Sequence, residues 1–147
     1  MRSGGCDHLF LEGVRIMFNH SISQVFATDD NQKFLSKSSF VGRTHISFEG
    51  GIAANTDNQE IDFGFQLNNA GGFNQIQSLL FFCTSALTIK TNSSSSPTQT
   101  IALSAGVALI WNIGSQTSCP ITADVTKLFL SNDTPSGARV EMRVLLQ

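Results

Sequence analysis

Apolar and polar side chains alternate without interruption in two stretches of the chain, residues 60–67 and 138–146. Successive side chains of a β-strand point to opposite faces of a sheet, so each stretch is predicted to be a strand with one dry face and one wet face. Such half-buried strands are typical of antiparallel sheets packed in pairs. The dry faces consist of Ile61, Phe63, Phe65 and Leu67 in the first stretch and of Ala138, Val140, Met142, Val144 and Leu146 in the second.

Other runs predict further strands along the chain, most of them by alternation and one, residues 76–83, as a continuous apolar run that is either buried on both faces or has one face on a partner. They lie at residues 14–18, 21–27, 44–53, 76–83, 87–91, 98–103, 107–111 and 121–131. Clusters of Gly, Pro, Asn, Asp and Ser separate these runs, and such clusters favour turns. Roughly nine or ten regularly spaced strands without a convincing helix predict an all-β fold, an antiparallel β-sandwich with a jelly-roll-like arrangement.

Several local features refine this prediction. Residues 19–20 favour a turn between the first two strands, whereas the Ser-rich segment 34–42 has no clear pattern. The segment 44–67 is expected to form one hairpin of two strands. The glycines at 50–51 indicate a bulge or a close backbone approach. The alternation slips at residues 124–127, where a single helical turn is predicted.

The length of 147 residues predicts one domain with a full core, which we place at residues 13–147. Residues 1–12 are predicted to form an N-terminal arm that a neighbouring molecule orders. The arm has no apolar run long enough for a secretion signal. The most apolar segment, residues 76–83, is too short to cross a bilayer, so we expect no membrane partner.

Composition narrows the classes of function. The net charge is −2 and no basic residues cluster, which argues against nucleic-acid binding. The charged fraction is only 14%, and neutral polar residues of this kind suit surfaces that other subunits cover. The aromatic residues are 12 Phe and one Trp without any Tyr, which indicates core rings rather than a sugar-stacking surface.

Neither the cysteines nor the acidic turns predict a cofactor. The three cysteines, Cys6, Cys83 and Cys119, are an odd number and are interpreted as buried thiols, with one disulfide plus a free thiol as the alternative. A zinc site would need more ligands than the segment 6–8 (Cys, Asp, His) supplies. The acidic turn at residues 29–31 lacks the central Gly and closing Glu of a calcium loop. We therefore expect no metal.

The candidate catalytic residues are scattered. His20 is expected in a turn and His45 on the wet face of a strand, and each is interpreted as a surface histidine. Glu60 and Asp62 share one strand face, as a glycosidase pair might, but on a single strand they more often form a solvated face. No G-x-S-x-G motif is present. The sequence therefore predicts a protein that is not an enzyme.

The second half of the chain resembles the small structural proteins of tailed bacteriophages. The resemblance rests on the strand pair at residues 98–111, on the succession 121–132 followed by a turn and 138–145, and on the paired strands of 44–67. It covers residues 44–147. It implies a β-sandwich that is commonly trimeric, that decorates (cements) the head or belongs to the tail or fibre, and that has no catalytic residues.

These expectations combine into a capsid decoration protein, a structural virion protein assembled in the host cytoplasm. It is expected to form a homotrimer and to bind the major capsid protein or other virion subunits. Phe81 and Phe82 are adjacent, so one ring should enter the core and the other face a loop or a partner, unless both faces are buried within the domain. The residues proposed for subunit contacts are Phe81, Phe82, Leu79, Leu9 and Phe10.

The alternative is a tail-fibre or host-binding module that recognises carbohydrate. Sugar sites usually stack pyranose rings on exposed Trp or Tyr side chains, and Trp111 is the single candidate. It alternates with Val107 and Leu109 on the predicted core face, which speaks against this function.

Overall fold

The computed structural model describes residues 17–27, 33–69 and 71–147, which form ten β-strands and no helix. The predicted all-β class is confirmed. The strands are β1 (Phe18–Ala27), β2 (Lys33–Gly42), β3 (Thr44–Ile52), β4 (Thr56–Leu67), β5 (Ile76–Cys83), β6 (Leu87–Thr91), β7 (Thr100–Leu103), β8 (Leu109–Asn112), β9 (Val125–Asn132) and β10 (Ala138–Leu146).

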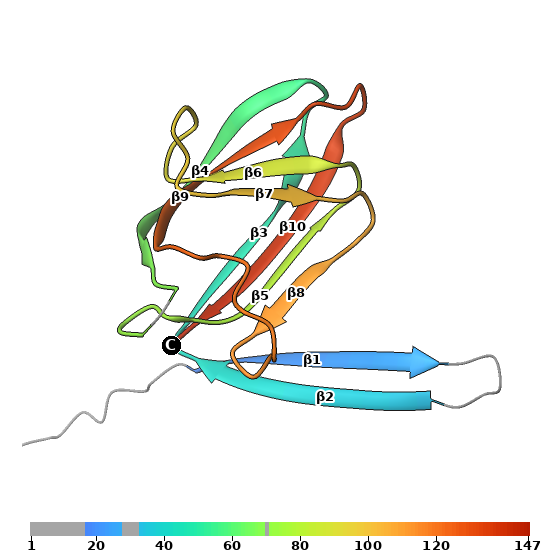
Figure 1. Ribbon diagram of the computed structural model, residues 1–147, viewed down its shortest axis with the longest axis vertical. Coiled ribbons are helices and arrows are strands. Elements are labelled where there is room, and N and C mark those ends of the chain that lie inside the picture. Colours follow the sequence, from blue (N-terminus) through green and yellow to red (C-terminus); the bar gives the residue numbers. More distant parts are fainter. Residues whose placement is uncertain (1–16, 28–32, 70) are drawn as a thin grey trace, which may run out of the picture.

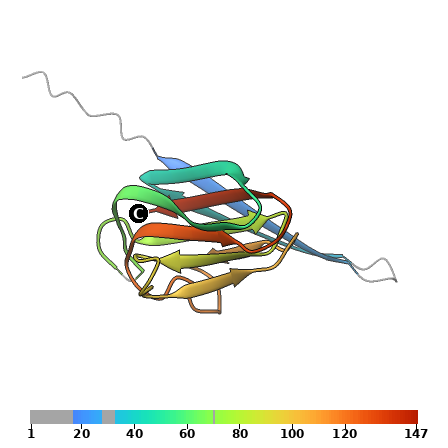
Figure 2. The same cartoon turned by 90° about the horizontal axis from the view of Figure 1, so that it is seen from above.

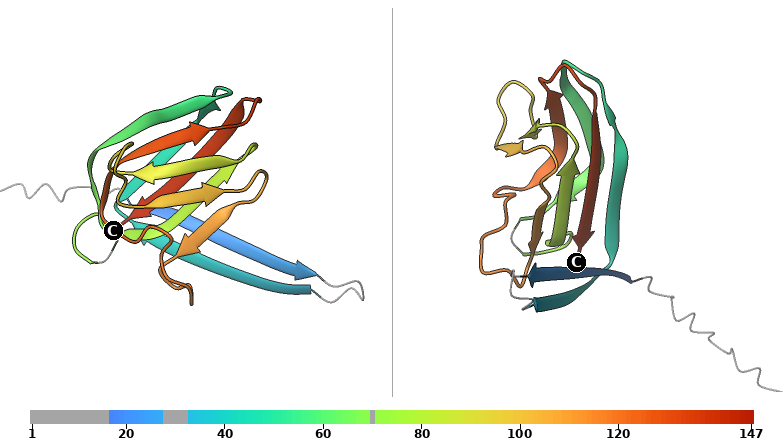
Figure 3. Two further views of the ribbon diagram at one scale, coloured as in Figure 1. Left: turned by 45° about the horizontal axis from the view of Figure 1, so that its top comes forward. Right: turned by 90° about the vertical axis from the view of Figure 1, so that its right-hand side faces the viewer.

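Eight strands form a sandwich of two layers (Figures 1 and 3). One layer has the order β3-β10-β5-β8 and the other has the order β4-β9-β6-β7, with antiparallel pairing throughout. The chain changes layer at every connection except the one from β6 to β7. Two four-stranded sheets connected in this way form a jelly roll, so the predicted antiparallel, jelly-roll-like sandwich is confirmed.

The apolar core lies between the two layers. The alternation predicted for residues 138–146 is confirmed, because all five residues of its dry face are at most 3% exposed. Arg139, Glu141 and Arg143 point to the opposite face, as expected. Other fully buried side chains come from both layers, among them Ile52, Leu67, Leu79, Phe81, Ile89, Leu128 and Leu130.

The alternation predicted for residues 60–67 is broken at Gly64. Ile61 and Phe63 pack against the core and Leu67 is buried, but Phe65 is 38% exposed. Gly64 has a φ angle of 70°, and the register of β4 against β9 shifts between Asp62 and Leu67. A glycine enters this left-handed region without the penalty that a Cβ carries, and the resulting irregularity turns Phe65 out of the core.

The strands β1 and β2 form a separate antiparallel hairpin with ten residue pairs, from Phe18–Gly42 to Ala27–Lys33. It crosses the end of the sandwich near the C-terminus and projects beyond it (Figures 1 and 2). The predicted turn at residues 19–20 is wrong, because β1 runs through both. The segment 34–42, which shows no clear pattern in the sequence, is almost the whole of β2.

The boundaries of the sandwich differ from the predicted ones. The sandwich begins at Thr44, so the predicted domain at residues 13–147 contains both the sandwich and the hairpin. The predicted arm at residues 1–12 lies outside the described residues, as does the predicted strand at 14–18 except for its last two residues.

Three local predictions need correction. β3 and β4 lie in different layers, so the segment 44–67 is not a hairpin. Residues 124–127 contain no helical turn, since β9 begins at Val125. The pairing of β3 with β10 runs through Gly50 and Gly51 without a bulge. The alternative, a close backbone approach, does not occur either: a Cβ on Gly50 would lie 3.0 Å from the Phe48 ring, and a Cβ on Gly51 would lie 3.9 Å from the Ala138 oxygen.

Gly42 joins the hairpin to the sandwich, and we predict that Gly42→Ala destabilises the protein by about 1–3 kcal/mol. A Cβ at this position would collide with the carbonyl oxygen of Leu146 and would lie 2.7 Å from Cγ of Leu145, so backbone must move. Urea denaturation measures the effect. Gly51→Ala is the matched control, because its Cβ would meet only the Ala138 oxygen at 3.9 Å. Equal stability of the two variants would contradict the tight joint.

Asn132 holds two turns together, and we predict that Asn132→Ala lowers the free energy of unfolding by about 2–4 kcal/mol. The side chain is fully buried, and its Nδ2 donates to the carbonyl oxygens of Ile52, Ala53 and Ser136. The substitution removes the donor from these three carbonyl oxygens and leaves a cavity at a fully buried position. Thermal and urea unfolding measure the loss. The exposed neighbour provides the control, Asp133→Ala, which should stay within about 0.5 kcal/mol of the wild type.

Candidate functional site

A cleft of about 480 Å³ lies between the hairpin and the β3-β10-β5-β8 sheet. The hairpin contributes His20 and Ile22 from β1, and the sheet contributes His45 from β3, Ser78 from β5 and Arg143 from β10. These residues are distant in sequence. They meet because the hairpin contacts β5 and β10 at its base.

The two histidines face one another in this cleft. Their rings are 4.8 Å apart between centroids and perpendicular, and the ring of Phe18 lies 5.7 Å from that of His45. Nδ1 of His20 and Oγ of the buried Ser78 form a hydrogen bond of 2.8 Å. Nε2 of His45 is buried without a hydrogen-bond partner among the described residues. The pair therefore packs as a joint between the hairpin and the sandwich.

The charges around the joint are balanced on the sheet. Arg143 donates from Nε to Glu141 at 3.0 Å and from Nη1 to Ser47, and its Nη2 lies 3.7 Å from Glu49. Glu49 also pairs with Arg139. Burial lowers the pKa of His20, and the nearby His45 and Arg143 lower it further. His20 is therefore held in its neutral form, which fits the close contact with a second imidazole.

The cleft does not assemble a catalytic group. The contact between Ser78 and His20 has the length of a nucleophile–base pair, but Ser78 is only 1% exposed. A catalytic histidine is normally oriented by a carboxylate, and here the second neighbour is another imidazole. No group of three or more metal-ligating side chains occurs among the described residues. The segments 6–8 and 29–31, considered for metals above, lie outside those residues.

The sequence pattern does not predict that the two histidines meet. The predicted turn at His20 is wrong, because His20 lies inside β1. His45 lies on the outer face of β3, as predicted. One available signal is the alternation of Phe18, His20 and Ile22, which places all three on one face of a continuous strand.

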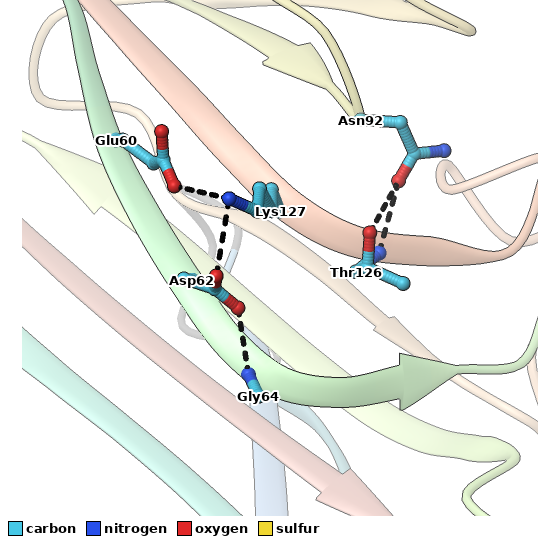
Figure 4. A network of polar contacts seen from close by, with 6 residues as sticks. All are labelled: Glu60, Asp62, Gly64, Asn92, Thr126 and Lys127. Carbon is cyan, nitrogen blue, oxygen red and sulfur yellow. Dashed lines mark hydrogen bonds and ion pairs between the residues drawn. The ribbon is translucent and has the colours of Figure 1, made fainter.

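The second acidic candidate, Glu60 with Asp62, is a surface ion-pair network on the other sheet (Figure 4). Nζ of Lys127 lies 2.6 Å from Glu60 and 3.1 Å from Asp62. The backbone N–H of Gly64 donates to Asp62 at 2.8 Å, and this bond, followed by Lys127, lowers the pKa of the Asp62 carboxyl. The hydrogen bonds that Lys127 donates to Glu60 and Asp62 raise the pKa of Lys127. Both acids are thus paired with one lysine on the surface, unlike a glycosidase acid and base.

Asn92 anchors the Ser-rich connection between β6 and β7 to the start of β9 (Figure 4). Its Oδ1 accepts a hydrogen bond from the Thr126 N–H at 2.9 Å, and its Nδ2 donates to the Asp124 carbonyl at 2.8 Å. Its φ of 66° lies in the left-handed region that Asn tolerates well. The contacts are structural and leave no group free for chemistry.

The residues expected at subunit contacts separate into three groups. Leu79 and Phe81 are each 1% exposed in the core, so the expectation is corrected for both: a partner cannot reach them. Phe82 lies on the outer face of β5 and is half-buried. Leu9 and Phe10 lie outside the described residues.

Other apolar side chains are more exposed than the predicted ones. Val25 and Leu35 oppose one another on the hairpin and are each 64% exposed. Phe73, in the connection from β4 to β5, is 82% exposed and lines a smaller cleft of about 310 Å³ with Arg43 and Gln147. Exposed apolar side chains of this size mark contact surfaces when they cluster. Sequence reasoning missed them because alternation does not identify the face that remains uncovered.

The described cysteines are free thiols. Cys83 is buried, as expected, whereas Cys119 is only half-buried. Burial raises the pKa of both thiols and so suppresses the reactive thiolate form. Cys6 lies outside the described residues. In the described ranges, no helix has the length and hydropathy to span a membrane.

We predict that acid loosens the base of the hairpin. The pKa of His20 is lower when docked than in a free chain, so the detached hairpin takes up more protons once the pH falls below about 6.5. The stabilisation is complete above that pH and is lost as the pH falls through the lowered pKa. Amide hydrogen exchange at residues 18–22, corrected for intrinsic rates, should be faster at pH 5 than at pH 7.5.

The control for this effect is His20→Gln, which retains a side-chain donor for Ser78 but does not titrate. It should remove most of the pH dependence of exchange. The other groups facing His20 are His45 on β3 and Arg143 on β10, with Glu141 and Glu49 paired to that arginine. If the glutamine variant keeps the full pH dependence, one of these groups and not His20 is responsible.

Comparison with known proteins identified no relative of this chain. No protein-family model matches the chain, and no significantly similar curated protein or solved structure was found. The sequence resemblance and the geometry of this structure are therefore what indicate a function.

Proposed function

We propose that this chain is a structural protein of a virus particle, a capsid decoration (cement) protein that stabilises the shell of a tailed bacteriophage through subunit contacts. The observation that carries the proposal is the exposure of apolar side chains away from the core. Val25 and Leu35 on the hairpin and Phe73 at the end of the sandwich are each more than 60% exposed. A protein whose largest exposed apolar groups lie outside any catalytic cleft is suited to work through its contact surfaces.

The fold is compatible with this function without requiring it. Viral capsid domains share the jelly-roll architecture, but so do lectins and cupins, so the fold class alone carries little weight. The residues that resemble phage structural proteins, 44–147, are the residues of the sandwich. The resemblance and the domain boundary therefore coincide, which supports treating the sandwich as the unit that a shell would carry.

The surface around Phe73 is the one we assign to the shell. Phe73 lies beside Arg43 and Gln147, at the end of the sandwich where the hairpin leaves and the chain ends (Figure 1). Met17, which precedes β1, is 62% exposed. An aromatic side chain next to a cation suits a protein partner, since Phe and Arg are both enriched in interfaces.

In a homotrimer, three copies of this small apolar contact surface would bind the shell together. Each copy offers only a few apolar side chains, and linking several copies converts later contacts into intramolecular ones with a high effective concentration. The function proposed here therefore needs a homo-oligomer that binds the major capsid protein or another virion subunit, on particles assembled in the host cytoplasm.

The carbohydrate-binding alternative loses its one aromatic candidate. Trp111 is only 8% exposed, and its Nε1 donates to the Thr117 carbonyl at 2.9 Å. A ring held in this way has no free face for a sugar to stack on. Tail-fibre or host-binding roles remain as outcomes of the experiment below.

We predict that the protein sediments with capsids in gradients of particles from the cells that naturally produce it, and that Phe73→Ser weakens this association by about tenfold. The matched control is Val107→Ser, a similarly exposed apolar residue (60%) in the connection from β7 to β8. It should bind like the wild type. Wild-type protein found only with tails would favour the tail module, and protein absent from all particles would refute the proposal.

A further inference from the structure

The half-buried His45 has a ring nitrogen that the fold leaves without a partner. Its Nε2 is buried and makes no hydrogen bond, the one buried side-chain nitrogen or oxygen in the described part of the chain of which this holds. Burying such an atom without a partner costs free energy, whether it carries the lone pair or the hydrogen. A group that bonds to this nitrogen would therefore stabilise the folded chain.

The facing histidine, His20, is held in the way that metal-binding histidines are held. Its Nδ1 lies 2.8 Å from Oγ of the buried Ser78. When Nδ1 donates its hydrogen to Ser78, Nε2 carries the lone pair and can ligate a metal. Histidine ligands normally donate from their second ring nitrogen to an oxygen of the protein in this manner. Burial lowers the pKa of His20, which favours the neutral imidazole that binds metals.

The spacing of the two rings fits one shared ion. A ligating nitrogen lies about 2.05 Å from zinc and its ring centre about 1.15 Å beyond, so two imidazoles on one ion have centres roughly 4.5–5.2 Å apart for bond angles of about 90° to about 109°. The rings of His20 and His45 are 4.8 Å apart between centroids and perpendicular. Edge-to-face contacts share this spacing, and it is the unpartnered Nε2 that favours an ion.

We propose that His20 and His45 bind one divalent transition-metal ion, such as Zn²⁺ or Cu²⁺, through their Nε2 atoms, between the hairpin and the sandwich. Imidazole suits these ions, whereas Mg²⁺ and Ca²⁺ prefer oxygen ligands. The other coordination positions fall to water in the cleft of about 480 Å³ that both histidines line. The ligands belong to β1 and β3, so the sequence contains no local motif for this site. The inference goes beyond the proposed function and is tested without any shell.

The charges near the two rings are compatible with a bound cation. Arg143 is the positive group beside His20, and it is paired with Glu141 and with Glu49. The site therefore does not face an unopposed positive charge. On the other side the ring of Phe18 lies 5.7 Å from that of His45.

An ion held by one histidine from each part would fasten the base of the hairpin to the sandwich. Two of the four ligands of a structural zinc site supply about half of its binding free energy, which corresponds to a dissociation constant on the order of 10 µM. Free Zn²⁺ at about 100 µM would then slow opening-limited exchange of the base about tenfold. Amide hydrogen exchange at residues 18–22 measures this effect, and Mg²⁺ at the same concentration should have none. Unchanged exchange with Zn²⁺ bound would contradict the bridge.

The binding test uses the full chain after treatment with EDTA, with Zn²⁺ added in equilibrium dialysis at neutral pH. We expect one ion per chain for the wild type and at least about tenfold weaker binding for His20→Gln and for His45→Gln, because each variant keeps only one ligand. The matched control is His8→Gln, which removes the third histidine of the chain, outside the described residues. It should bind within about twofold of the wild type. Circular dichroism confirms that each variant remains folded.

Pulsed electron paramagnetic resonance of bound Cu²⁺ tests the histidine pair without altering it. The variant His8→Gln leaves His20 and His45 as the only histidines, so two imidazole nitrogens on one copper ion identify both as ligands. A single imidazole on the copper would overturn the inference, and so would zinc binding that only His8→Gln abolishes. A wild type that binds no Zn²⁺ at about 1 mM would also overturn it and leave the two rings as an edge-to-face contact.

Discussion

The C-terminal strand β10 is the constraint on which the rest of the structure depends. It pairs with β3 on one side and β5 on the other, and its dry face supplies five of the fully buried core residues. The pairing of Thr44 with Leu146 closes almost the whole length of the sandwich. Contacts of such separation in sequence carry a large loop-closure cost and slow folding.

The same strand fixes the hairpin. Leu145 and Leu146 end β10 and are fully buried, although only Leu146 faces the core of the sandwich. Leu145 is covered instead by the hairpin, where Gly42 approaches too closely for any side chain. The docked base thus behaves as part of the sandwich and responds to the protonation of His20, whereas the projecting half has no such support and depends on what covers it.

Much of the sandwich could be predicted from the sequence, because alternation records which face of a strand is buried. It succeeded for β10, and it failed at Phe65, where the irregularity at Gly64 changes which face the following side chain takes. It also failed for sheet membership, since β3 and β4 are adjacent in sequence but lie in different layers. Pairing partners in a jelly roll are mostly non-local, and alternation contains no information about them. The same limit explains why His20 and His45 were predicted as separate surface residues: they meet only through the docking of the hairpin.

The molecule has a charged and an apolar kind of surface, and they differ in whether their side chains already have partners within the subunit. On the outer faces of both sheets the charged groups pair within the subunit, Lys127 with Glu60 and Asp62 on one sheet and Arg139 with Glu49 on the other. Such faces gain little from a partner, because a contact would have to replace hydrogen bonds already made. The exposed apolar side chains make no such pairs, among them Val25, Leu35 and Ile110. Any surface that removes their apolar area from water lowers the free energy. The exposed apolar side chains of the hairpin therefore gain more from being covered than the charged outer faces of the two sheets do.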